Sequence, residues 1–102
     1  MKARQSERVA LRIPIRIEWR GYAHDTHTIV VNRGGALVAA PVPFPAEVSL
    51  SLHNLSTGGL ARFRVVWCGS EEAPGRHHMG IALAEDKLSF WGPEYEQSLT
   101  GP

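Results

Sequence analysis

Two arginines near the start of the chain, Arg8 and Arg12, have the side-chain type and spacing that suit an anionic ligand. A guanidinium group presents several N–H donors in a fixed fork, so it can bind phosphate oxygens or stack on a purine. Both arginines stand where an irregular N-terminal segment would meet an apolar alternation that begins at Ile13. On its own the Arg-x-x-x-Arg pattern is weak, and a basic segment that serves solubility is the ordinary alternative.

A second candidate for ligand binding is the segment formed by Asn32, Arg33, Gly34 and Gly35. Glycines let the backbone approach a ligand closely and expose N–H groups to an anion. The ordinary alternative is a tight turn that joins two strands.

The remaining reactive side chains do not form a recognisable catalytic or metal-binding pattern. The chain has no Gly-x-Ser-x-Gly nucleophile motif, and its single cysteine, Cys68, is expected to pack as a small apolar residue. The five histidines include the adjacent pair His77 and His78, which face opposite sides of a regular strand and are poorly placed to share one ion. We therefore expect neither an enzyme nor a metal or other cofactor.

The elements that would position these residues are short strands. Apolar residues alternate with polar ones in six segments, and turn residues separate the segments. The expected strands cover residues 13–20, 26–32, 36–40, 47–52, 60–67 and 77–83. The pattern predicts an all-β fold, a small six-stranded antiparallel β-barrel. A short helical turn is expected over 85–91, followed by a loose tail.

Length and charge limit the class of protein further. The 102 residues suffice for one domain, which we divide into a flexible basic arm (1–11), a barrel (12–90) and a C-terminal tail (91–102). The net charge is only +1, but residues 1–20 carry six Lys/Arg against two Glu. No apolar run has the length of a membrane span, and the basic start lacks the apolar stretch of a signal peptide, so a cytoplasmic location is expected.

Taken together, the motifs resemble those of the PilZ domain family. Five segments carry the resemblance over residues 7–90: Arg8-Val-Ala-Leu-Arg12-Ile-Pro-Ile, Val30-Val-Asn-Arg-Gly-Gly-Ala-Leu-Val38, Glu47-Val-Ser-Leu50, Arg64-Val-Val-Trp67 and Met79-Gly-Ile-Ala-Leu83. No single segment is decisive, and their order and spacing carry the case. The resemblance implies a bacterial regulatory barrel that binds the second messenger cyclic di-GMP.

The resemblance also implies a role for each matched residue. Arg8 and Arg12 would clamp the phosphates and guanine edges of cyclic di-GMP, with Arg4 as a further arginine at the same spacing. Asn32 stands where the family has Ser, and Gly35 where it has its closing Gly; Arg33 and Gly34 lie between them. The sequence departs from the family at Val30, which replaces an Asp or Asn and offers no hydrogen-bond acceptor.

Three functions follow from these observations. The first is a stand-alone cyclic di-GMP sensor of weakened affinity that acts on a protein partner. The second is a protein-interaction module that has lost nucleotide binding, with Phe90, Trp91 and Tyr95 as a docking patch. The ordinary alternative for Phe90 and Trp91 is that they cap the end of the barrel. The third is a barrel that binds single-stranded nucleic acid through the basic arm and Trp19, which the low net charge and the apolar face of Trp19 disfavour.

Overall fold

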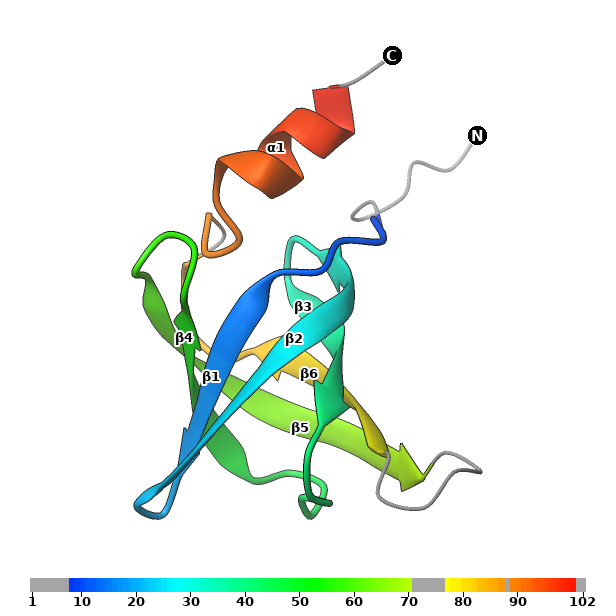
Figure 1. The fold of residues 1–102 in the computed structure, drawn as a ribbon, viewed down its shortest axis with the longest axis vertical. Helices are drawn as coiled ribbons and strands as arrows, with labels where there is room; N and C mark the ends of the chain where they lie inside the picture. Colours follow the sequence, from blue (N-terminus) through cyan, green and yellow to red (C-terminus); the bar gives the residue numbers. More distant parts are fainter. Residues whose placement is uncertain (1–7, 71–76, 88, 101–102) are drawn as a thin grey trace.

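Six β-strands form a closed barrel in which neighbouring strands are antiparallel. The computed structural model describes residues 8–70, 77–87 and 89–100. The strands are β1 (Pro14–Trp19), β2 (Tyr22–Asn32), β3 (Gly35–Ala40), β4 (Ser49–Asn54), β5 (Leu60–Ser70) and β6 (His77–Leu83). Their order around the barrel is β1-β2-β3-β6-β5-β4, and β4 pairs with β1 to close the circuit (Figure 1). The predicted six-stranded antiparallel barrel is confirmed.

The first hairpin shows how the alternating sequence becomes a barrel wall. The isoleucines at 13, 15 and 17 are fully buried, whereas Arg16 faces outward and its Nε lies 2.6 Å from Asp25 Oδ1 on β2. The turn consists of Arg20 and Gly21, whose φ angles of 51° and 82° match the two-residue turn that right-twisted strands prefer. Because the turn is so short, β2 begins at Tyr22, earlier than the sequence predicts.

Two β-bulges on the barrel wall change which side chains face outward. The β2–β3 register shifts between Thr28 and Val30, and the β5–β6 register shifts between Val65 and Trp67. A bulge sets two residues against one on the partner strand, so the alternation reverses beyond it. Strict alternation would place Trp67 on the face of the buried Val65. The bulge instead leaves the Trp67 side chain on the outer face, 48% exposed.

Aromatic side chains close one end of the barrel. Phe90, Trp91 and Tyr95 are at most 6% exposed. The Phe90 ring centroid lies 5.2 Å from that of Phe63 and 4.8 Å from that of Trp91, which are distances typical of favourable edge-to-face packing. The expectation that Phe90 and Trp91 cap the barrel end is confirmed, and the docking patch of Phe90, Trp91 and Tyr95 is wrong, because these side chains cover the apolar core.

Helix α1 (Pro93–Thr100) follows Phe90 and Trp91, contains Tyr95, and lies beyond the same end of the barrel (Figure 1). Proline suits the first helical position, and Glu94 and Glu96 in the first turn favour the positive end of the helix dipole. The prediction of a short helical element near the C-terminus is confirmed, but its position is not. The described residues of 85–91 form bends and turns, and the helix covers Pro93–Thr100, where a loose tail was expected.

An N-terminal strap, residues 8–13, runs along β2 before β1 begins. Val9 and Val31 exchange backbone hydrogen bonds of 2.8 and 2.9 Å. The hydroxyl of the buried Thr28 donates a hydrogen bond to the backbone oxygen of Leu11. It also accepts one, 2.8 Å long, from the backbone N–H of Ile13. The described part of the predicted basic arm is thus hydrogen-bonded to the barrel. Arg4 lies outside the described residues.

Candidate ligand-binding site

A hollow of about 260 Å³ lies on the outer face of the barrel, over β2, β3, β6 and β5. Its lining includes Arg8, Val30, Asn32, Leu37, Trp67 and Gly80. Four of these residues form one row across neighbouring strands, in the order Val30, Leu37, Gly80 and Trp67. We call this site the arginine–tryptophan hollow.

Trp67 provides the broad flat surface of this hollow. Its indole lies directly against Gly80, because a Cβ placed on Gly80 would stand 2.5 Å from the indole Nε1. Only glycine permits so close an approach without displacing the ring. The indole is therefore held against β6 while about half of the Trp67 surface stays open to solvent. An open indole is a suitable platform for stacking a base.

Arg8 supplies the charge of the hollow. Several other arginines are engaged in ion pairs, namely Arg16 with Asp25, Arg33 with Glu96 and Arg64 with Glu47. Within the described part of the chain, neither Arg8 nor Arg12 has a carboxylate partner. Among the described residues, no carboxylate therefore competes with an anion for either guanidinium group that the sequence singles out.

The structure does not bring Arg8 and Arg12 into one hollow. Val9 pairs with Val31 between them, and Arg12 lines a different hollow that contains His27. Arg12 therefore reaches a ligand in the arginine–tryptophan hollow only if the strap moves.

Arg33 points away from the hollow and toward the C-terminal helix. Its Nη1 lies 3.1 Å from Glu96 Oε2, and its guanidinium carbon lies 5.7 Å from the centre of the Tyr95 ring. The structure thus gives Arg33 a contact with α1. A ligand role for Arg33 stays a prediction, and this contact would have to open first.

The other residues of the second predicted segment have separate structural tasks. Asn32 Oδ1 accepts a hydrogen bond from the N–H of Gly34 at 3.0 Å, and the Asn32 backbone oxygen accepts one from Trp91 Nε1 at 2.8 Å. A Cβ on Gly35 would lie 2.4 Å from the backbone oxygen of Ile81, so glycine is needed where β3 approaches β6. Of the four residues, Asn32 is the one that lines the hollow.

Trp67 and Gly80 are site residues that the sequence analysis does not single out for binding. The signal in the sequence is the apolar run of residues 65–67, which interrupts the alternation of β5. A run of this kind is compatible with a bulge, but the register of the partner strand decides where the bulge falls. The pairing of Trp67 with Gly80 is a long-range contact that local pattern does not reveal.

The described residues also limit other kinds of site. They contain no group of three or more His, Cys, Asp or Glu side chains arranged to hold a metal ion. In the same ranges, no helix has the length and apolar character needed to cross a membrane.

The barrel and its wall hollow define a small single-barrel module, and comparison with known proteins gives its family. The family model of the PilZ domain matches residues 2–88, so the chain belongs to the PilZ domain family. PilZ domains are regulatory modules rather than enzymes. A search of curated proteins gives no match.

The fold is shared with solved structures, among them that of the Bacillus subtilis inhibitor of motility (MotI/DgrA), which has a TM-score of 0.75 and 17% sequence identity to this chain. The similarity covers 98% of this chain and 53% of that one, so this chain spans about half the length of the solved protein. At this identity the likeness supports the fold alone.

Proposed function

We propose that this chain is a regulatory module that binds cyclic di-GMP in the arginine–tryptophan hollow. The observation that carries the proposal is that Arg8, which has no carboxylate partner among the described residues, lies in one hollow with the open indole of Trp67. A cyclic dinucleotide offers both complementary groups, because its phosphates are anionic and its guanines are flat. Membership of the PilZ family supports this choice of ligand.

Each lining residue has a defined task in the proposed complex. Trp67 stacks on one guanine, an interaction worth about 1–3 kcal/mol per base. Arg8 donates paired hydrogen bonds to a phosphate or to the guanine O6/N7 edge. Asn32 keeps an amide N–H₂ group for the ligand, since its oxygen is used by the turn at Gly34.

Val30 makes the proposed site a weak one. Val30 lines the hollow but has only an alkyl side chain, so it cannot accept a hydrogen bond from the guanine N–H groups. The loss of one charged hydrogen bond costs about 1.5–3 kcal/mol, which corresponds to about 10- to 100-fold in affinity. We therefore propose a sensor of reduced affinity.

Arg12 gives the proposed module its switch. Because Arg12 lies on the other side of the Val9–Val31 bridge, both arginines can clamp one dinucleotide only after the strap leaves β2 and folds over the ligand. The rearranged strap then offers a new surface to a protein partner, which is an order of events common in ligand-driven switches.

Calorimetric titration of the whole chain with cyclic di-GMP tests the proposal. Wild-type protein should give saturable heat, and Arg8→Gln and Trp67→Ala should each weaken binding by about tenfold or more. Arg64→Gln is the matched control, because Arg64 is exposed on β5, pairs with Glu47 and does not line the hollow. No heat and no change in melting temperature at about 1 mM ligand would refute a sensor.

A second variant separates a weak site from a lost one. Val30→Asp combined with Asn32→Ser restores the hydrogen-bonding groups of the family motif. Binding that tightens by about 10- to 100-fold from a measurable wild-type value agrees with the proposal. Binding that occurs only in the double variant would instead identify a module that has given up the nucleotide.

A further inference from the structure

The arginine–tryptophan hollow has room and contacts for one nucleotide. Its volume of about 260 Å³ lies below the roughly 300–1,000 Å³ of pockets that enclose drug-sized molecules, and a cyclic dinucleotide is at least as large as such molecules. Among the described residues that line it, Trp67 is the aromatic side chain and Arg8 is the cationic one. One side of the indole lies against Gly80, so Trp67 offers a single face to a single base.

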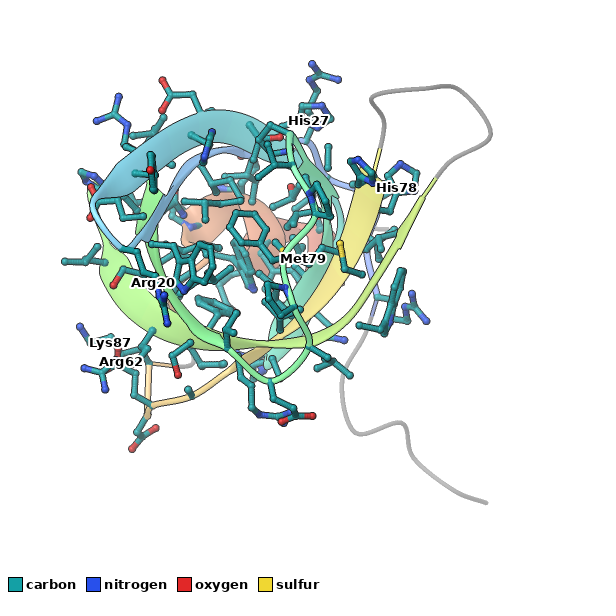
Figure 2. All side chains as sticks on the ribbon, turned by 90° about the horizontal axis from the view of Figure 1, so that it is seen from below. Arg20, His27, Arg62, His78, Met79 and Lys87 are labelled. Atoms are coloured by element: carbon teal, nitrogen blue, oxygen red, sulfur yellow. The ribbon has the colours of Figure 1, made fainter. Side chains whose placement is uncertain are left out.

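The surroundings of the hollow give a second base no place either. Figure 2, seen from below, shows side chains across the barrel interior, and Met79, which precedes Gly80 on β6, is fully buried there. Toward the strap, the Val9–Val31 bridge separates this hollow from the one that Arg12 lines. The second nucleotide of a bound dinucleotide therefore lies outside the hollow, toward solvent.

The side chains that line the hollow present donors and almost no acceptors. The guanidinium of Arg8 and the indole N–H of Trp67 can only donate hydrogen bonds. Asn32 Oδ1 accepts from the Gly34 N–H at 3.0 Å, which leaves the amide N–H₂ group as the polar group for a ligand. The rest of the described lining is glycine or alkyl side chains: Val30, Ala36, Leu37, Val66, Gly80 and Ile81.

A lining of this kind distinguishes guanine from adenine at one edge of the base. Guanine carries two neighbouring acceptors there, O6 and N7, which match the forked donors of Arg8. Adenine has its N6 amino group in place of O6, so a donor of the base would face a donor of the protein. The opposite edge of guanine, which carries N–H donors, meets the alkyl side chain of Val30 and contributes no selectivity.

We infer that the hollow recognises one guanine nucleotide of its ligand and leaves the second base unread. This inference rests on the proposed function and specifies the ligand class, which is any cyclic dinucleotide that contains at least one guanine. Mixed cyclic GMP–AMP belongs to this class beside cyclic di-GMP, and cyclic di-AMP does not. Arg12, once the strap folds over the ligand, adds a positive charge for the phosphates, which all three molecules share.

Calorimetric titration of the whole chain with these three cyclic dinucleotides tests the inference. Cyclic di-GMP can enter with either of its guanines, so it should bind only about twofold more tightly than cyclic GMP–AMP. Cyclic di-AMP should bind at least about tenfold more weakly than cyclic GMP–AMP, because it lacks the O6 acceptor. In NMR spectra, the indole N–H signal of Trp67 should shift with both guanine-containing ligands.

Variants show whether the same residues carry both ligands. Trp67→Ala should weaken cyclic di-GMP and cyclic GMP–AMP by the same factor, about tenfold or more. Arg8→Gln should reduce the preference of cyclic GMP–AMP over cyclic di-AMP, because a glutamine amide suits the N6/N7 edge of adenine. Arg64→Gln, outside the hollow, should leave all three affinities unchanged. Amide spectra of every variant establish that the barrel is folded.

The possible failures are distinguishable. If cyclic di-GMP binds and cyclic GMP–AMP binds at least about tenfold more weakly, both bases are read; the inference is overturned and the proposed function stands. If cyclic di-AMP binds as tightly as cyclic di-GMP, the hollow does not recognise guanine and the inference is also overturned. If cyclic di-GMP gives no heat, the proposed function fails and the inference fails with it.

Discussion

Replacing Gly35 with alanine should destabilise the barrel strongly, whereas the same change at the neighbouring Gly34 should be tolerated. A Cβ on Gly35 would lie 2.4 Å from the Ile81 backbone oxygen, whereas ordinary contacts begin at 3.4 Å. Strands β3 and β6 must therefore separate by up to about 1 Å. That separation strains the adjacent hydrogen bond from the N–H of Leu83 to the Gly34 oxygen, which is 2.8 Å long.

The size of the effect follows from two contributions. Overpacking a close contact costs about 1–3 kcal/mol, and each weakened backbone hydrogen bond adds about 0.5–1.5 kcal/mol. We expect Gly35→Ala to lower the free energy of unfolding by about 2–4 kcal/mol, a large part of the total for a domain of this size. The melting temperature should fall by at least about 10 °C.

Gly34→Ala provides the matched control within the same turn. A Cβ there meets no atom within 4 Å, and alanine restricts the unfolded chain, so stability should stay within about 0.5 kcal/mol or rise slightly. Urea denaturation of the two variants and the wild type measures the difference. If the free energies of unfolding of Gly35→Ala and Gly34→Ala differ by less than about 1 kcal/mol, the close approach of β3 to β6 does not explain the glycine at position 35.

Three further predictions concern the strap, the first hairpin and the C-terminal helix. Thr28→Val removes one buried and one half-buried hydrogen bond to the strap and should lower the free energy of unfolding by about 2–4 kcal/mol in urea denaturation. Thr26→Val loses one half-buried hydrogen bond and should lower it by about 1 kcal/mol. The hydrogen bond from Arg16 lowers the pKa of Asp25. This pair therefore stabilises the folded state at pH values above the usual pKa of an aspartate, and the stabilisation is lost as the pH falls through the lowered pKa. An NMR pH titration of Arg16→Gln should find the pKa of Asp25 returned toward its usual value. Arg33→Gln removes a half-exposed ion pair to α1 and should cost less than about 1 kcal/mol in a thermal melt.

The strands were predictable from sequence because one face of each is buried in a single core. Burial on one face forces apolar residues to recur at every second position, and the sequence marks β6 with the same bounds that the structure gives, His77–Leu83. The two bulges were not predictable in this way. They depend on the register between neighbouring strands, which local sequence does not encode. For this reason the alternation of β5 did not predict that Trp67 faces outward.

The candidate site was predictable in part. The sequence singled out Arg8 and Asn32, which the structure places in one hollow. It also grouped Arg8 with Arg12, but the pairing of Val9 with Val31 sets them on different parts of the wall. That pairing joins residues 22 positions apart, so it cannot be predicted from local residue spacing. The helix α1 was misplaced for a related reason, since the aromatic residues before it are drawn into the barrel end.

Closure of the barrel determines how another protein can recognise it. Because β4 returns to β1, each described strand has a hydrogen-bonded neighbour on both sides. An added peptide strand needs a free row of backbone N–H and C=O groups, which this sheet offers only where a long strand extends past one neighbour, as β5 does at Trp67–Ser70. Over the rest of the wall, a partner must recognise side chains. Recognition then depends on which side chains a ligand rearranges, and the sheet itself can stay unchanged.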